Sequence, residues 1–464
     1  MLSKYLTVRR AAPLLVAGVI ALGAGPLSTV GHAAGSGDGR TDFNGDGYAD
    51  LVVGAPAGTI GGQGHAGYVV VMYGGPDGPS ATRYSVISRA TGGIPGDPVK
   101  DERFGAQVSK GDLDGDGYAD LVVSGTGKGS VIVWGGSAGL SGGTAVPGYG
   151  SASQTGDFNG DGQRDLALFQ TSVAPGDDPM GTTAAIWYGP VSRTGTPASS
   201  TTLDNQDLGY FDVWDAVPGD VDHDGRTDLA LSVYCGEGTY CTRLYLGAPS
   251  GLTSTPSGTA PEGWQAMALG DVNGDGYADM VTGNAMDNQI TVAYGSASGL
   301  TDPTTWQTFT QDTPGVPGAD EPEDGFGTSV SVGDVTGDGY ADVVVGSPGE
   351  ALGTTQGAGD VTLLHGGPSG LTGDGAQVIT QNTTGVPGTA EAGDGFGSRV
   401  RLLDTDADGH ADLAAAATGE NSGTGAVWAL HGQPTGIVPD GALVVGPVTL
   451  GTPDTAASFG STLR

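Results

Sequence analysis

Cysteine is nearly absent from this sequence, which has only Cys235 and Cys241 among its 464 residues. A chain with so few cysteines is not a disulfide-rich scaffold. Because the two lie close together, we predict a local Cys235–Cys241 disulfide that stiffens one hairpin and does not link distant parts of the chain. The alternative is a pair of free thiols.

Positive charge is also scarce. The chain has 17 Lys and Arg against 52 Asp and Glu, which gives a net charge of −35. A field of this sign repels phosphate backbones and anionic lipid headgroups. We therefore expect no nucleic-acid partner and no binding to an anionic membrane surface.

Long helical patterns are missing beyond the first 30 residues. Apolar residues come instead in short runs joined by turns that are rich in the chain's 89 glycines, a pattern that predicts an all-β fold. No H-E-x-x-H, P-loop or C-x-x-C motif is present. A match to G-x-S-x-G at 135–139 is a turn that recurs without the serine at 74–78 and 366–370. We therefore favour a protein without catalytic activity, although an active site assembled from several repeats stays open.

The N-terminus has the pattern of a secretion signal. Three basic residues precede an apolar stretch over 11–24 that is too short for an ordinary membrane span, and a small-x-small cleavage site ends at Ala33. We predict a signal peptide over 1–33 and a mature domain over 34–464, whose net charge would be −38 after the three basic residues are lost. The mature protein is then expected to be secreted or associated with the cell surface, without membrane insertion. An uncleaved anchor is the alternative.

A nine-residue pattern, D-x-[D/N/T]-x-D-G-x-x-D, occurs seven times at intervals of 45 to 70 residues. Each copy leads into a short apolar strand, and in most repeats a second strand follows and ends in a glycine-rich turn. Repeats of this length, built from several strands, predict propeller blades or a solenoid.

The two ends of the chain decide between a ring and a solenoid. In three repeats a Phe-Gly pair lies eight residues before the first loop aspartate, at Phe104, Phe326 and Phe396. The first repeat lacks this pair, whereas an orphan Phe459-Gly460 lies near the C-terminus. The last strand therefore fits as the missing first strand of the first blade, which leaves no free sheet edge. We predict a seven-bladed β-propeller closed by pairing of the C-terminal strand with the N-terminal blade.

The seven loops have the oxygen-rich composition of a calcium site, and we predict up to seven Ca²⁺ ions. Calcium takes about six to eight oxygen ligands at flexible geometry. Positions 1, 3, 5 and 9 offer side-chain oxygens, the glycine at position 6 permits a sharp turn, and position 7 offers a backbone carbonyl. The alternative is that some loops are turns without a metal. The predicted ligands are Asp42, Asn44, Asp46, Tyr48 and Asp50; Asp112, Asp114, Asp116, Tyr118 and Asp120; Asp157, Asn159, Asp161, Gln163 and Asp165; Asp220, Asp222, Asp224, Arg226 and Asp228; Asp271, Asn273, Asp275, Tyr277 and Asp279; Asp334, Thr336, Asp338, Tyr340 and Asp342; and Asp404, Asp406, Asp408, His410 and Asp412.

The loops differ in charge. Those that start at Asp112, Asp220 and Asp404 have four carboxylates, and three others replace one carboxylate with Asn. The loop at Asp334 has Thr336 at position 3, which predicts the weakest ligand set. Imidazole is a poor calcium ligand, so only the backbone carbonyl of His410 is expected to bind.

These motifs resemble the FG-GAP (VCBS) repeat family, which is found in the N-terminal propeller of integrin α-chains and in secreted bacterial proteins. The best copy combines Phe326-Gly327, the loop over 334–342 and Gly346-Ser347-Pro348, and the first repeat has a literal Gly-Ala-Pro at 54–56. The three middle repeats lack Phe-Gly, so their blade geometry is less certain than their loops. The resemblance implies a calcium-stabilised propeller that serves as a platform for binding.

Aromatic residues gather in the middle of the chain, where residues 187–245 hold eight of the 30. Exposed aromatic side chains at strand ends can stack on sugars or anchor a protein partner, whereas buried ones pack between blades. Tyr210 and Trp214 are the candidate ligand-binding residues. We expect an extracellular binding or adhesion platform for protein or glycan. The alternatives are a carbohydrate-active enzyme, such as a polysaccharide lyase or hydrolase built on a propeller, and a structural envelope protein.

Overall fold

The structure, a computed structural model, describes residues 41–464 apart from 127–128, 173–177, 204–207, 257 and 263–265. The predicted signal peptide lies outside the described residues. None of the described helices is long and apolar enough to span a membrane.

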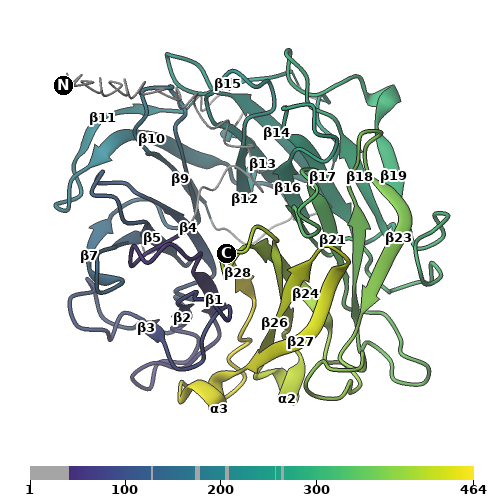
Figure 1. Ribbon diagram of the computed structural model, residues 1–464. Helices are drawn as coiled ribbons and strands as arrows, with labels where there is room; N and C mark the ends of the chain where they lie inside the picture. Colours follow the sequence, from purple (N-terminus) through teal and green to yellow (C-terminus); the bar gives the residue numbers. More distant parts are fainter. Residues whose placement is uncertain (1–40, 127–128, 173–177, 204–207, 257, 263–265) are drawn as a thin grey trace, which may run out of the picture. The chain divides into compact units, whose positions relative to one another are not determined.

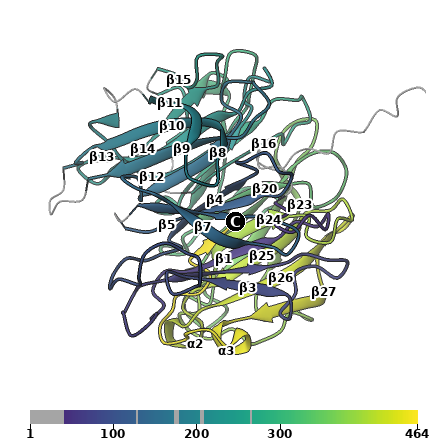
Figure 2. The same cartoon turned by 90° about the vertical axis from the view of Figure 1, so that its left-hand side faces the viewer.

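The described chain forms seven four-stranded antiparallel sheets arranged as the blades of a propeller (Figures 1 and 2), which confirms the predicted fold. Blades 1 and 2 contain β28 (Thr462–Leu463), β1 (Leu51–Ala55), β2 (Tyr68–Met72) and β3 (Tyr84–Ile87), then β4 (Gln107–Gly111), β5 (Asp120–Ser124), β6 (Ser130–Trp134) and β7 (Ser141–Val146). Blades 3 and 4 contain β8 (Ala152–Gly156), β9 (Asp165–Thr171), β10 (Thr182–Val191) and β11 (Pro197–Thr202), then β12 (Asp212–Gly219), β13 (Asp228–Gly236), β14 (Thr239–Leu246) and β15 (Thr253–Ser254).

The remaining three blades follow the same order. Blades 5 and 6 contain β16 (Ala266–Gly270), β17 (Asp279–Asn284), β18 (Gln289–Ala293) and β19 (Gln307–Phe309), then β20 (Ser329–Gly333), β21 (Asp342–Ser347), β22 (Asp360–His365) and β23 (Thr372–Ile379). Blade 7 contains β24 (Phe396–Leu403), β25 (Asp412–Ala417), β26 (Ala426–Gln433) and β27 (Gly436–Val445). The helical segments are short: η1 (Pro303–Thr305), α2 (Glu420–Gly423) and α3 (Pro447–Leu450). The middle repeats therefore form complete blades although they lack Phe-Gly.

The hydrophobic core lies between the blades. The buried apolar side chains form seven clusters, and each cluster draws its members from two adjacent blades. A strand in the middle of a blade is therefore covered on both faces, which explains why β1 and β5 are buried along their whole length and why the residues between Asp120 and Ser124 of β5 are all apolar. Outer strands face solvent, and β11 is polar and mostly exposed.

The two ends of the chain close the ring as predicted. Strand β28 pairs with β1, with Leu463 opposite Val53 and Thr462 opposite Gly54. Phe459 is fully buried in the cluster shared by blades 7 and 1, and its amide donates to the Thr424 carbonyl at 3.0 Å. The last residues therefore bridge the last blade to the first.

Each blade has a glycine near the end of its third strand, because the backbone of a neighbouring segment lies too close to leave room for a side chain. At Gly135 the amide donates to Asp120 at 2.8 Å, and a Cβ atom would lie 2.1 Å from the Ala119 carbonyl oxygen. That oxygen belongs to backbone and cannot swing away. By contrast, a Cβ on Gly136 would meet nothing within 4 Å.

We expect Gly135→Ala to lower the free energy of unfolding by about 1–3 kcal/mol, because the added methyl forces the backbone apart. Gly136→Ala is the matched control and should be nearly neutral. Denaturant unfolding of both variants measures the difference. Equal stabilities would show that the clash is relieved at no cost.

Candidate functional site

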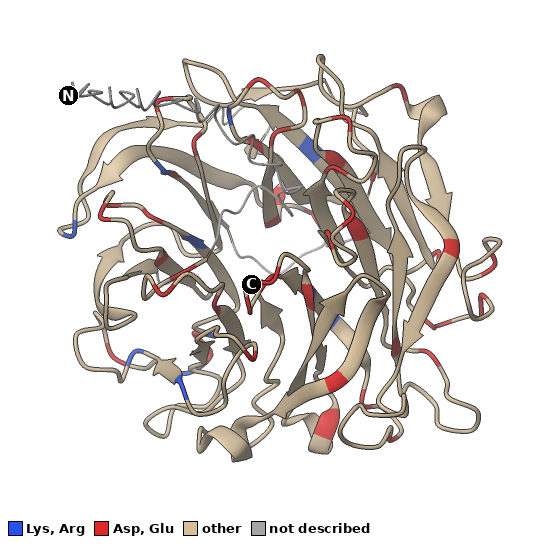
Figure 3. Ribbon diagram, viewed as in Figure 1, with Lys and Arg blue, Asp and Glu red and all other residues tan. Residues whose placement is uncertain are grey.

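The Asp-rich loops all lie at one end of the propeller. In blade 2 the loop over 112–120 joins the end of β4 to the start of β5, and blades 3 to 7 repeat this connection; in blade 1 the loop over 42–50 leads into β1, while the first strand β28 comes from the other end of the chain. The first strands contact one another around the ring, from β4 through β8, β12, β16, β20 and β24 to β28. Because each of these strands from β4 to β24 leads into its loop, and Ala119 N of the second loop donates to Asp42 O of the first at 3.0 Å, the seven loops share one rim, which we call the loop rim. Figure 3 shows acidic residues on every blade and few Lys or Arg.

The ninth residue of each loop is a buried aspartate that ties the loop to the third strand. Asp120 is fully buried, and its carboxylate accepts hydrogen bonds from Leu113 N at 2.9 Å and Gly135 N at 2.8 Å. The equivalent pair of bonds recurs in all seven loops, at Asp50, Asp120, Asp165, Asp228, Asp279, Asp342 and Asp412.

The first aspartate wraps the loop around itself. Asp112 Oδ1 accepts from Gly115 N at 2.8 Å and Asp116 N at 3.1 Å, and its Oδ2 accepts from Gly117 N at 2.9 Å. These bonds bend the loop so that its acidic side chains converge. Each loop with four carboxylates brings three of its acidic groups together, with one oxygen from each within 4.8 Å of the others; these sets are Asp112, Asp114 and Asp120; Asp220, Asp222 and Asp228; and Asp404, Asp406 and Asp408.

Burial makes these carboxylates costly to ionise. Desolvation, with a smaller contribution from neighbouring loop acids, raises the pKa of Asp50, Asp120, Asp228 and Asp279 to about 7 and that of Asp165 to about 6, despite the backbone hydrogen bonds that lower it. A cation at the centre of each loop would reverse this cost.

The donor set fits a hard divalent cation such as calcium, because it is anionic, made of oxygen atoms and partly buried. The Thr336 hydroxyl oxygen adds a second sign of fit: it is buried and has no hydrogen-bond partner among the described residues. The side chains at positions 1, 3, 5 and 9 would hold the ion, with the carbonyl at position 7. The chemistry it would supply is charge neutralisation.

The loops are also hydrogen-bonded to one another across blades. Ala119 N in the second loop donates to Asp42 O in the first at 3.0 Å, and Gly136 N donates to Phe43 O at 3.1 Å. The first of these bonds recurs from Thr227 to Asp157, Ala278 to Asp220, Ala341 to Asp271 and Ala411 to Asp334. The shape of one loop therefore affects how the next blade docks.

Arginine side chains reach three loops, and sequence reasoning missed these side-chain contacts, although it named Arg226 as a ligand through position 7. Arg193, from the β10–β11 turn of blade 3, donates to Asp114 at 2.5 Å and Asp116 at 2.6 Å in the second loop. Arg83 lies 3.5 Å from Asp46, and the Arg226 side chain pairs with Asp224 of its own loop. The motif contains no signal for Arg193, because it comes from the neighbouring blade.

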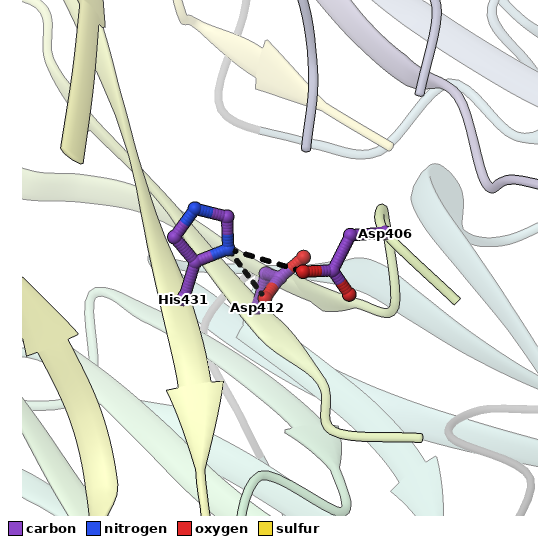
Figure 4. Close-up of side chains that lie close together, drawn as sticks. All are labelled: Asp406, Asp412 and His431. Carbon is purple, nitrogen blue, oxygen red and sulfur yellow. Dashed lines mark ion pairs between the residues drawn. The ribbon is translucent and has the colours of Figure 1, made fainter. Parts of the chain in front are cut away.

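Histidines at the ends of two third strands also reach loop acids. His431 Nδ1 lies 3.4 Å from Asp406 and 3.5 Å from Asp412 (Figure 4), and His365 Nδ1 lies 3.2 Å from Asp342. The nearby carboxylates, Asp412 first and then Asp406 and Asp408, raise the pKa of His431. A signal for both was available, because each occupies the position just before the required glycine, where four of the other blades have Tyr or Trp and blade 4 has Leu246. The His410 ring instead contacts the Val335 carbonyl of blade 6.

The middle aromatic residues divide into buried and exposed sets. Tyr245 is in the core, whereas Trp214 is 45% and Tyr210 73% exposed. Trp214 lies near the start of β12, at the opposite end of this strand from the Asp220 loop, and its ring packs edge-on against Tyr240 with centroids 6.0 Å apart. Tyr240 in turn lies 5.3 Å from Tyr234. We call Tyr210, Trp214, Tyr234 and Tyr240 the aromatic rim.

A disulfide joins the hairpin that supports the aromatic rim. Cys235 on β13 and Cys241 on β14 are bonded in the structure, each next to one of the two tyrosines. The bond links two strands that already pair, so it stiffens a local hairpin.

The fold and its loops define a class: a seven-bladed β-propeller with an Asp-rich loop in every blade. The FG-GAP repeat matches residues 34–72, 263–298, 326–364 and 396–430, and the FG-GAP-like repeat matches 112–168. The chain therefore carries FG-GAP and FG-GAP-like repeats at several positions, which is consistent with an FG-GAP repeat β-propeller. Blade 4, with most of the aromatic rim, lies outside these matches.

More distant similarities concern solved structures. The crystal structure of BBS1N in complex with ARL6DN, soaked with lead, has a chain 13% identical to this one at a TM-score of 0.41, with 75% of this chain and 82% of that chain covered. A crystal of the same complex soaked with mercury gives 12% identity and a TM-score of 0.42, with 74% and 82% covered. No curated protein sequence matches the chain significantly.

Proposed function

We propose that this protein is a secreted, calcium-stabilised propeller that acts as an extracellular binding or adhesion platform for a glycan or a protein. The observation that carries the proposal is the separation of two features along β12. Its C-terminal end leads into an acidic loop, whereas its N-terminal end presents exposed Trp214. Stabilisation and binding are thereby assigned to opposite ends of the same blade.

Calcium is the cation that best suits the loops in this setting. Extracellular calcium modules bind with dissociation constants of about 10⁻⁴–10⁻³ M, which is adequate only where the ion is abundant. The N-terminal signal pattern supports export to such a place. Bound ions would offset the net charge of −35 and hold the loop contacts between blades.

The aromatic rim is the proposed contact surface. An indole and phenol rings supply large, rigid, amphipathic area at small entropic cost, which is why such side chains dominate sugar-binding and protein-binding hot spots. The hairpin disulfide limits how far Tyr234 and Tyr240 can move when a partner arrives.

A screen of glycans and extracellular-matrix proteins, with and without calcium, should find a ligand for the wild-type chain. We expect Tyr210→Ala with Trp214→Ala to weaken its binding at least about tenfold while the melting temperature stays within about 2 °C, because exposed side chains contribute little to folding. Val448→Ala, at an apolar residue 76% exposed in α3, is the control and should bind normally. Binding unchanged in the double variant would contradict the proposal, and loss of fold would assign the two rings to packing.

A further inference from the structure

A cavity of about 110 Å³ lies on the axis of the propeller and is lined by residues from the first strands of six blades. Its polar lining includes Gln107, Trp214, Asp215, Ser329, Arg399 and Arg464. Gln107 and Ser329 are the first residues of β4 and β20, and these strands end at the acidic loops. The cavity therefore opens toward the end of the channel opposite the loop rim, where Trp214 also lies.

Two guanidinium groups share one carboxylate in this cavity. Arg464 Nη2 donates to both oxygens of Asp215, at 2.9 and 3.1 Å. Arg399 donates to the carbonyl of its neighbour Ser398 at 2.7 Å and forms no ion pair with a carboxylate in the described part of the chain. Arg399 therefore lines the cavity without a carboxylate partner of its own among the described residues, in a protein whose Asp and Glu outnumber its Lys and Arg threefold.

The surroundings of Arg399 make its positive charge unfavourable when no anion is present. Its side chain reaches the water of the cavity but is surrounded by protein, so desolvation lowers its pKa, as does nearby Arg464, while Asp215 raises it. A guanidinium stays protonated at any physiological pH and cannot escape the cost by losing its proton. An oxyanion that accepts its hydrogen bonds would recover this free energy.

We propose that this cavity binds the carboxylate of an acidic sugar, with Arg399 as the main partner of the carboxylate and Trp214 as the surface against which the sugar ring stacks. This inference rests on the proposed binding function and names its ligand class. The planar guanidinium matches a carboxylate with two parallel hydrogen bonds. The Trp214 backbone is positioned by Gln107, whose Nε2 donates to its carbonyl oxygen at 3.0 Å.

The size of the cavity and the exposed indole favour a sugar. A space of about 110 Å³ accommodates an acid group and a few waters, but not a folded partner, so the ligand must present its carboxylate on a slender chain. An apolar sugar face can then cover Trp214. The repulsion from distant acids is screened beyond about 8 Å at physiological ionic strength, so the short contacts to Arg399 decide the affinity.

The test is calorimetric titration of the full chain, in calcium, with a short oligosaccharide that contains glucuronate. Its neutral carboxyl-methyl ester and an Asp-rich peptide are the comparison probes. We expect the acidic oligosaccharide to bind and Arg399→Gln to weaken it at least about tenfold, since a charged hydrogen bond is lost. The ester should bind wild type as weakly as the acid binds the variant.

Lys100→Gln removes the same charge from a side chain that is 72% exposed and should leave binding unchanged. The melting temperature of Arg399→Gln should not fall, so that loss of binding is not loss of fold. Wild-type affinity in Arg399→Gln would overturn the inference, as would binding of the peptide in place of the oligosaccharide. If Trp214→Ala abolishes binding of another ligand that Arg399→Gln leaves intact, the platform stands and this inference fails; if no probe or screened ligand binds, both fail.

Discussion

Excess EDTA is expected to lower the melting temperature at pH 7 by more than about 10 °C. At ten times its dissociation constant, a calcium ion stabilises the folded state by about 1.4 kcal/mol, and seven loops together approach about 10 kcal/mol. The loss should be cooperative, because the loops are hydrogen-bonded from blade to blade, as from Ala119 to Asp42. Differential scanning calorimetry with and without EDTA measures it, with calcium added back as the control.

The effect of EDTA on the melting temperature should also depend on pH, in a direction that follows from the pKa values of the buried loop aspartates. Without metal, the folded pKa of Asp50, Asp120, Asp228 and Asp279 is about 7, against about 3.9 in an unfolded chain. The folded state then holds more protons, so the contribution of these aspartates to stability is complete below about pH 4 and is lost as pH rises through about 7. The destabilisation by EDTA should therefore be larger at pH 8 than at pH 5. An unchanged melting curve in EDTA at pH 8 would contradict calcium stabilisation.

Removal of residues 459–464 should cause the second large effect, because it opens the ring. Phe459→Ala alone is expected to lower the free energy of unfolding by about 3–5 kcal/mol, since Phe459 is fully buried between blades 7 and 1. The truncation also removes β28, which leaves the backbone edge of β1 without a partner. An unpaired edge promotes pairing between molecules, so the truncated chain should self-associate.

Light scattering and denaturant unfolding distinguish the two consequences. Phe309→Ala, in the outer strand β19, removes a ring of the same size without opening the ring of blades. It should lower stability while the protein stays monomeric. A truncated chain that remained monomeric with an unchanged melting temperature would show that closure contributes little.

Much of the fold could be predicted from patterns among residues that are close together in the sequence. Each nine-residue loop is shaped by hydrogen bonds within itself, such as those that Asp112 accepts from Gly115 and Gly117. The fixed distance from Phe-Gly to the loop then showed where Phe459 belongs, and the structure confirms it. The histidines at 365 and 431 were missed for a different reason: their position in the repeat was visible, but nothing in the sequence says which way the third strand turns its last side chain.

By itself the sequence determined the blade count, the closure of the ring and the acidic loops, because a repeat places the same residues at the same step of each blade. Only the tertiary structure decided what meets between blades. Arg193 reaches the loop of another blade, and Arg464 pairs with Asp215 from 249 residues away. Trp214 stays at the surface while Tyr245 is buried, although both lie in one aromatic segment. Such contacts depend on the curvature of the whole ring, which no single repeat contains.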